Sequence, residues 1–443
     1  MELRDFIVTP IIIFLVYAGA YWIRPRVTDS INRKYFIPAL TVRIIGALAV
    51  GFLYQFYYGG GDTFNFHTHG SRVIWEALVN DPIVGIKLLL SSGEYDGSVF
   101  TFAAKIPFYK DSSSFAVIRI ATIFDLITFS SYSATAILFA VVSFAGLWLL
   151  YKVFYEYYPS LHQSLAIACF FIPSVFFWGS GLLKDTITLT ATSISVFCVY
   201  QLFIKGEKSF YLSVTLIIFL YVLFIIKIYI LLILLPSIII WVFLNQIKKV
   251  KGLMAKILVT PIVLSFAFIL AGYSLIKAAE DNPKYSLSMI AQTAKITAYD
   301  IRFWTGRDAG SGYTLGELDG TFNSLLSLAP QAINVTLFRP YLWEVKNPLM
   351  LISSIESTIL MGLFIFLGMT SGRYFFYAAR DPIYTFCLIF SIIFAFGVGV
   401  STFNFGTLSR YKIPLLPFFL VALIIVSHYS NKSKKLSVLV ETE

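Results

Sequence analysis

Runs of about twenty apolar residues recur along the chain, and they limit what it can fold into. One stretch, residues 216–244, reads LIIFLYVLFIIKIYILLILLPSIIIWVFL. An α-helix needs about twenty such residues to cross the hydrocarbon core of a bilayer. The runs are continuous rather than alternating, which excludes a transmembrane β-barrel. We therefore predict an all-α, polytopic transmembrane helical bundle with about eleven spans, at 7–23, 40–57, 131–151, 164–182, 186–204, 209–226, 228–245, 256–276, 348–369, 383–400 and 412–428.

The composition supports a membrane protein and argues against a nucleic-acid partner. Charged residues make up 13% of the chain, about half the share in a soluble domain. The net charge of +10 is better explained by basic cytoplasmic loops than by nucleic-acid binding. Cys169, Cys198 and Cys387 lie within apolar runs, so we interpret them as small buried hydrophobic residues.

The basic residues predict an orientation for the chain. They concentrate in alternate loops, at Arg24, Arg26, Arg33, Lys34 and Arg43, at Lys152, at Lys205 and Lys208, at 248–256, at Arg373 and Arg380, and at 432–435. The intervening short loops hold only Lys184, Lys227, Arg410 and Lys412. Because cytoplasmic loops carry the excess of lysine and arginine, the N-terminus is expected outside and the C-terminus in the cytoplasm.

Two long segments of the single membrane domain, residues 1–443, then fall on the outer face. The first outer loop, residues 58–130, contains RVIWEALVNDPIVGIKLLLSS and SSFAVIRIATIFDLITF. Their apolar residues recur at helical spacing, which is typical of amphipathic helices lying in the membrane interface. The second outer loop, residues 277–347, is the most polar part of the sequence, and we interpret it as an ordered binding loop.

Several charged groups on this outer face form the candidate site. They are Asp62 in GGGDTFNFH, Lys184 and Asp185 in WGSGLLKDT, Arg302 and Arg307 in the second outer loop, Arg339 further along that loop, and Arg410 in SRYKIPLLPF. Arginine and lysine can hold a phosphate, and a carboxylate can take a proton from a hydroxyl nucleophile. Together these groups suit the transfer of a group away from a lipid phosphate.

Each of these residues also has a simpler interpretation. The GGGD stretch can be a flexible helix exit with a capping Asp62. Lys184 and Asp185 can be an ordinary interfacial ion pair, and Arg410 can be a flanking anchor at the end of a span. His67 and His69 are more simply polar interfacial residues than metal ligands, since two histidines alone are weak evidence for a metal site.

The chain resembles membrane-embedded glycosyltransferases of the C type (GT-C), the class of the protein O-mannosyltransferases and the bacterial aminoarabinose transferases. GGGDTFNFH is similar to the family's Gly-Asp-x-x-x-Tyr motif at the start of the first outer loop, with Asp62 at the acidic position. GLLKDTITL and SRYKIPLLPF match the acid of the next outer turn, at Asp185, and the arginine of a late span, at Arg410. Phe66 stands where the family usually has tyrosine, and the motif follows the second span rather than the first.

The resemblance implies an enzyme that moves a sugar from a polyprenyl-phosphate donor to a glycan, lipid or protein acceptor, in the bacterial inner membrane. It implies that Asp62 is the general base, that Asp185 assists, and that Lys184, Arg302, Arg307, Arg339 and Arg410 hold the donor phosphate. If a divalent metal is used, Asp62 and His67 are the pair expected to bind it.

Two other classes remain open at this point. A lipid-linked glycan polymerase or ligase would also use an arginine-rich outer loop; it predicts essential arginines within 302–339 and a dispensable Asp62. A transporter or flippase would show internal repeats and charged residues near the middle of its spans. Neither is evident in the sequence, where Lys227 lies between two predicted spans.

Overall fold

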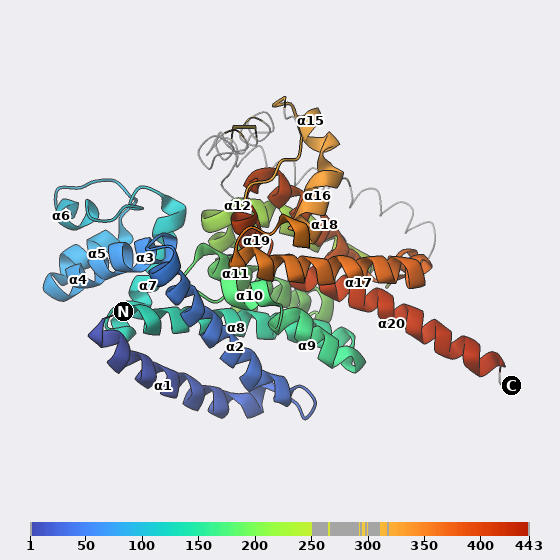
Figure 1. Cartoon of the computed structure of the whole chain (residues 1–443). Helices are drawn as coiled ribbons and strands as arrows, with labels where there is room; N and C mark the ends of the chain where they lie inside the picture. The colour runs from blue at the N-terminus through green and yellow to red at the C-terminus, as the bar shows by residue number, and fades with distance from the viewer. Residues whose placement is uncertain are drawn as a thin grey trace. The chain divides into compact units, whose positions relative to one another are not determined.

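The computed structural model describes residues 2–249, 311–316 and 319–441, together with residues 265, 292, 295, 296 and 299. In this part of the chain the regular secondary structure is helical, apart from a single isolated β-bridge between Gly312 and Asn404. The all-α fold is therefore confirmed. The chain divides into two compact units, one of residues 1–197 and 214–227, the other of residues 198–213 and 228–443. Figure 1 gives the order of the helices along the chain.

The first unit contains long apolar helices and a group of short ones. The long helices are α1 (Leu3–Val27), α2 (Arg33–Phe52, extended by the π-helical turn η1, Leu53–Tyr57), α8 (Tyr132–Tyr157) and α11 (Lys184–Val199). The short ones are α3 (Asp62–Phe66), η2 (His67–Ser71), α4 (Arg72–Asn80), α5 (Pro82–Leu90), α6 (Phe100–Ala103), η3 (Pro159–Leu161), α9 (His162–Phe170) and α10 (Pro173–Trp178), and α7 (Ser112–Thr128) is of intermediate length. Helices α3 to α7 lie together (Figure 1).

The second unit is built mainly from α16 (Ala329–Phe338), α17 (Pro348–Ala378), α18 (Pro382–Thr402) and α20 (Leu416–Glu441), which pack on one another. Shorter elements are η4 (Tyr200–Lys205), α15 (Phe322–Ser327), η6 (Leu342–Glu344) and α19 (Phe405–Tyr411). Helix α12 (Phe210–Ile247) contributes to both units, and its backbone is non-helical at Lys227, with φ −147° and ψ 80°.

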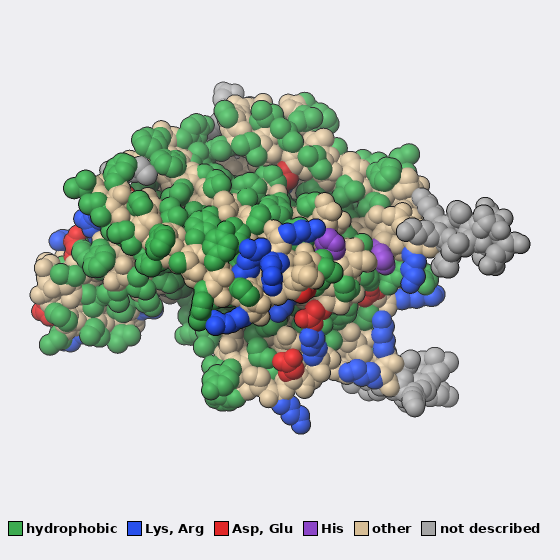
Figure 2. Space-filling model, turned by 90° about the horizontal axis from the view of Figure 1, so that it is seen from below, with side chains coloured by type: hydrophobic (Ala, Val, Ile, Leu, Met, Phe, Trp, Pro, Cys, Tyr) green, Lys and Arg blue, Asp and Glu red, His purple; other side chains and the backbone are tan. Residues whose placement is uncertain are grey.

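Seven helices in the described residues are long and apolar enough to cross a membrane, and α19 with α20, bent by 69°, makes an eighth candidate. This supports a multi-pass membrane protein, whose surface shows abundant hydrophobic side chains in Figure 2. The predicted spans 7–23, 40–57, 186–204, 348–369 and 383–400 each fall within one of these helices or its π-helical extension. The span 256–276 lies outside the described residues except for residue 265, so the count of eleven stays a prediction.

One predicted span is not a continuous helix. Residues 164–182 form α9 and α10, separated at Phe171 and Ile172. Pro173 begins α10 and Ile172 is extended, because the proline ring disfavours helical backbone in the residue before it. Within residues 58–130, Asp81 likewise separates α4 from α5, because its side chain accepts from the Ile83 and Val84 amides at the start of α5. The stretch 72–92 is therefore two helices rather than one.

The placement of Arg43 among the cytoplasmic loop residues is wrong. Arg43 lies inside α2 and its side chain is fully buried. The basic bias of the alternate loops persists without it, and the orientation of the termini stays a prediction.

Candidate active site

The three glycines before Asp62 are required by the backbone. Gly59, Gly60 and Gly61 have φ of +67°, +139° and +120°, a region that side chains make costly. The Gly60 amide donates to the Tyr54 carbonyl oxygen at 2.9 Å, which closes the turn on the end of η1. The chain can therefore leave α2 sharply and begin α3 at Asp62, whose side chain is partly exposed.

The residue after Asp62 anchors α3. The Thr63 hydroxyl shares a 2.7 Å hydrogen bond with the Tyr132 hydroxyl at the start of α8. Both residues are buried. Asp62 is thus held at the end of a fixed helix rather than on a tether.

Lys184 joins three elements of the first unit. Its ammonium donates to Asp111 Oδ2 at 3.2 Å and to Ser113 Oγ at 2.7 Å. Asp62 and Lys227 also lie close enough to act electrostatically on it. Lys184 therefore brings together the start of α11, the start of α7 and the acid of the glycine turn. We call Asp62, Asp111, Lys184, Asp185 and Lys227 the charged cluster.

Asp185 lies next to Lys184 but has a different environment. It is 2% exposed and forms an ion pair with Lys227, which is 8% exposed. Lys227 is the residue at which the α12 backbone departs from helical geometry. A buried ion pair compensates the cost of taking two charges out of water, so Asp185 is neutralised inside the protein rather than presented to solvent.

Asp111 is held in its charged form. Burial raises its pKa, but hydrogen bonds from Ser114 and Ser113 and the positive charge of Lys184 outweigh burial, and the pKa lies below its usual value. Asp111 also caps α7 by accepting from the Ser113 amide at 3.3 Å. The cluster therefore contains a charged carboxylate that fixes the Lys184 ammonium.

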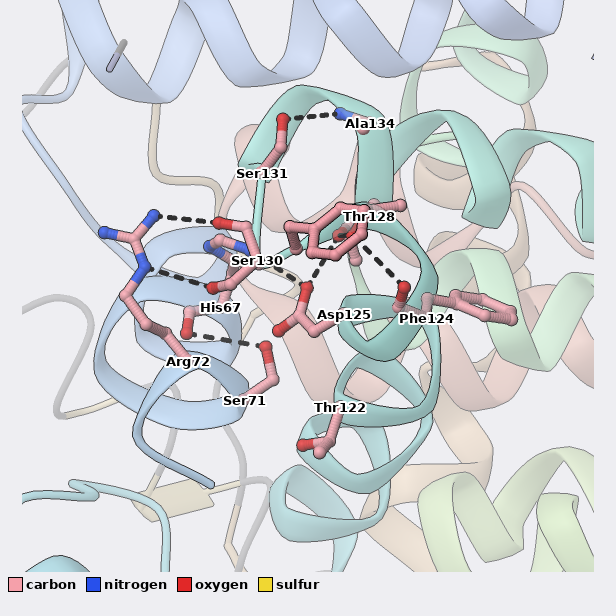
Figure 3. Close-up of polar contacts among 12 residues, drawn as sticks. His67, Ser71, Arg72, Thr122, Phe124, Asp125, Thr128, Ser130, Ser131 and Ala134 are labelled. Atoms are coloured by element: carbon pink, nitrogen blue, oxygen red, sulfur yellow. Dashed lines mark hydrogen bonds and ion pairs between the residues drawn. The ribbon is translucent and has the colours of Figure 1, made fainter. Parts of the chain in front are cut away.

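His67 points into the protein interior, as Figure 3 shows. Its Nε2 lies 3.3 Å from Asp125 Oδ1, and both side chains are fully buried. The two groups are in ion-pair range but are not aligned for a hydrogen bond. Asp125 Oδ1 accepts instead from the Thr135 hydroxyl at 2.7 Å, and Thr135 in turn contacts Thr128.

This placement bears on the expected metal pair of Asp62 and His67. The part of the chain that the structure describes contains no group of three or more His, Cys, Asp and Glu side chains that could hold a metal ion. The imidazole of His67 faces α7 and α8 through Asp125 and Tyr132. The metal site at Asp62 and His67 therefore stays a prediction.

Four arginines are expected to hold the donor phosphate. Arg339 and Arg410 lie in the second unit, and Arg302 and Arg307 lie outside the described residues. Arg339 is engaged by the Glu344 carboxylate, with Nε 3.1 Å and 3.0 Å from its two oxygens. Burial raises the pKa of Glu344, but hydrogen bonds from Arg339 and the Tyr341 amide outweigh it and lower the pKa. Arg339 is therefore already paired with a charged carboxylate.

Arg410 lies in the last turn of α19, just before the bend into α20. Its neighbour Lys412 is fully buried and donates to Ser357 Oγ at 3.0 Å. The Ser357 hydroxyl in turn donates to the Arg339 carbonyl oxygen at 3.0 Å. Arg339, Ser357 and Lys412 thus form a linked polar group within the second unit.

A cavity of about 150 Å³ lies elsewhere in the first unit. Its polar walls come from Glu2, Asp5, Gln55, Thr68, Arg72, Tyr132 and Ser133, and none of the charged cluster lines it. The volume is below the range of about 300–1,000 Å³ that is usual for ligand pockets. The cavity is not the candidate site.

Sequence reasoning found Asp62, Lys184 and Asp185 but missed their partners. Asp111 carries one readable signal, the capping pattern of an acid before three serines. Lys227 interrupts an apolar run, and from the sequence we interpret it as part of a short loop between two spans. The sequence predicts that Asp125 lies on the polar face of an interfacial helix, but the structure buries it completely.

No known protein family matches the sequence, no curated protein is detectably similar to it, and no solved structure matches it.

Proposed function

We propose that the protein is a membrane-embedded glycosyltransferase that moves a sugar from a polyprenyl-phosphate donor to an acceptor hydroxyl on the extracytoplasmic side. One observation carries the proposal. Asp62 lies far in the sequence from the adjacent residues Lys184 and Asp185, yet all three belong to one charged cluster in the first unit. These are residues that the resemblance to GT-C enzymes and the charge pattern single out.

The chemistry assigns a different role to each group. Asp62 is partly exposed, and in this mechanism it accepts the proton of the acceptor hydroxyl. The acceptor oxygen forms a bond to the anomeric carbon, while the bond from that carbon to the phosphate oxygen breaks. The polyprenyl phosphate leaves with the bonding electrons. A cation near the phosphate stabilises the charge that develops on it.

Lys184 is the cation of the cluster best placed for the phosphate. Its side chain is 22% exposed and is oriented by Asp111 and Ser113. Lys227 is buried against Asp185, so this pair supports the site rather than contacting substrate. Arg410 remains a candidate for donor binding, whereas Arg339 would first have to leave Glu344.

A transfer assay on the purified protein tests this function. The protein in detergent is incubated with a labelled polyprenyl-phosphate sugar and a mixed membrane extract as acceptor source. We expect release of polyprenyl phosphate that depends on the protein and is lost in Lys184→Met. Glu94→Gln, an exposed acid in the same outer segment, is the matched control. Donor that stays intact with every sugar tried would contradict the proposal.

One observation favours a second function, a transporter. Lys227 and Arg43 are buried charges within apolar helices, and such residues mark substrate pathways in transporters. A transporter would move substrate across proteoliposome membranes without breaking a covalent bond. Uptake with intact donor, abolished by Lys227→Met, would favour this function. The polymerase alternative depends on residues that include Arg302 and Arg307, which lie outside the described residues.

A further inference from the structure

Arg43 is a fully buried arginine inside a membrane-spanning helix. Its Nη1 donates to the Val175 carbonyl oxygen at 2.8 Å and to the Gly179 carbonyl oxygen at 3.0 Å. The hydroxyls of Ser143 and Ser180 lie 3.3 Å and 3.4 Å from the same nitrogen. A charged side chain in this position is expensive and usually has a function.

The carbonyl groups that Arg43 contacts belong to the end of α10. The carbonyls at the end of a helix carry partial negative charge. The Val175 carbonyl oxygen also accepts from the Gly179 amide at 3.1 Å, whereas a carbonyl past the last turn, such as that of Gly179, must be satisfied inside a membrane protein by other protein groups. Here the Ser143 hydroxyl also donates to the Gly179 carbonyl oxygen, at 2.5 Å. The end of α10 is therefore fixed by side chains from α2 and α8.

The segment that follows leads directly to the charged cluster. Residues 179–183 form a turn that ends one residue before Lys184, and Leu182 and Leu183 are fully buried. The Thr186 hydroxyl closes the turn from the other side by donating to the Gly181 carbonyl oxygen at 2.6 Å. A shift of this turn would therefore move Lys184 and Asp185.

Helix α2 also packs closely on this region, through Gly46 and the Val50 side chain. A Cβ added at Gly46 would come within 2.1 Å of the Phe176 carbonyl oxygen, and one at Gly181 within 2.7 Å of Val50. The same helix continues through η1 and the glycine turn to Asp62. One helix thus supports both the turn before Asp185 and the segment that carries Asp62.

We infer that Arg43 is a positioning residue: it holds the turn of residues 179–183 on α2 and so sets the places of Lys184 and Asp185 relative to Asp62. It acts through the turn and touches no substrate. This inference rests on the proposed function, which makes these residues a catalytic site. The effect of Arg43 on the position of Asp185 can be measured without an activity assay.

A double-mutant cycle measures the position of Asp185. Asp185→Asn, Lys227→Met and the double variant are compared by thermal unfolding in detergent, in the native protein and with Arg43→Met added. The non-additive part of the Tm shifts reports the Asp185–Lys227 contact. We expect it to fall by at least half with Arg43→Met. An unchanged non-additive part would overturn the inference, because Arg43 would then stabilise the fold without positioning Asp185.

Thr41→Val is the matched control, because Thr41 lies on the same helix but bonds Tyr17 of α1. It is expected to leave the non-additive part unchanged, and an equal fall there would also overturn the inference. Arg43→Lys keeps the measurement possible if Arg43→Met does not fold. Every hydrogen bond that the structure gives Arg43 uses Nη1. The single ammonium of Arg43→Lys is therefore expected to retain more than half of the non-additive part. Complete loss of the non-additive part in Arg43→Lys would contradict the inference.

The same variants separate this inference from the proposed function. In a transfer assay, Arg43→Met is expected to lower kcat/KM several-fold and Arg43→Lys to lower it less, because the turn that places Lys184 and Asp185 is displaced more when no ammonium replaces the guanidinium. Absence of any transfer by the native protein would remove the proposed function and leave the unfolding cycle to decide the role of Arg43.

Discussion

The carboxylate of Asp185 and the ammonium of Lys227 form an ion pair in the interior of the first unit, although 42 residues separate them in the sequence. Asp185 is 2% exposed and Lys227 is 8% exposed. The pair joins the first turn of α11 to the break in α12. It therefore connects the candidate site to a point where a long apolar helix changes direction.

Removing one member of this pair is predicted to destabilise the first unit strongly. Asp185→Asn or Lys227→Met leaves a buried charge without compensation, which costs about 3–5 kcal/mol. The double variant Asp185→Leu with Lys227→Met is expected to lose much less than the two single changes together, because no unpaired charge remains. Chemical denaturation in detergent measures this, and additive losses would show that the two groups are not coupled.

The glycine turn before Asp62 is predicted to be intolerant of side chains. Gly60→Ala and Gly61→Ala place a Cβ at strongly positive φ, at a cost of about 1–2 kcal/mol each. At Gly61 the added Cβ also lies 3.0 Å from the Tyr54 ring. Gly97→Ala is the control, since its surroundings are open and its φ is ordinary. Equal unfolding midpoints for all three variants would contradict this account of the turn.

The contact between Asp111 and Lys184 is predicted to make the protein sensitive to acid. The folded-state pKa of Asp111 lies below its ordinary value of 3.8. A carboxyl group with a lowered pKa contributes stability that is present above that ordinary value and is lost as the pH falls through the folded-state pKa. The Tm difference between the native protein and Asp111→Asn should therefore be largest near neutral pH and shrink below pH 4. A difference that grew on acidification would reverse the assignment.

The two histidines that follow the glycine turn, His67 and His69, are predicted to behave differently. His67 is fully buried beside Asp125 and Tyr132, so His67→Leu is expected to cost about 0.5–3 kcal/mol. His69 is exposed, so His69→Gln should change stability by less than about 0.5 kcal/mol. Comparison of the two unfolding curves decides this, and a larger effect at His69 would mean that this segment is oriented the other way.

The sequence was enough to predict an all-α membrane protein, because continuous apolar runs of about twenty residues are compatible with few structures other than membrane-spanning helices. The interruption at Phe171 and Ile172 was not predicted, since the surrounding residues are apolar and only Pro173 marks the break. Residues 256–276 other than 265, and a large part of 277–347, lie outside the described residues, so the predictions made there remain predictions.

The candidate site was partly predictable for a related reason. Asp62, Lys184 and Asp185 stand in short polar motifs that differ from their apolar surroundings. Their partners do not: Lys227 resembles a loop residue between two spans, and Arg43 resembles a flanking basic residue. Sequence position does not reveal that each is buried against groups more than forty residues away.

The rate of sugar transfer by Asp62→Asn tests the central claim most directly. The substitution keeps the shape of the side chain and removes its ability to accept a proton, so a general-base role predicts a loss of about 10²–10⁴-fold in kcat. The Tm is expected to stay within a few degrees of the native value, because Asp62 is partly exposed and Thr63 still anchors α3. Transfer within about threefold of the native rate, by a protein with an unchanged Tm, would contradict the account.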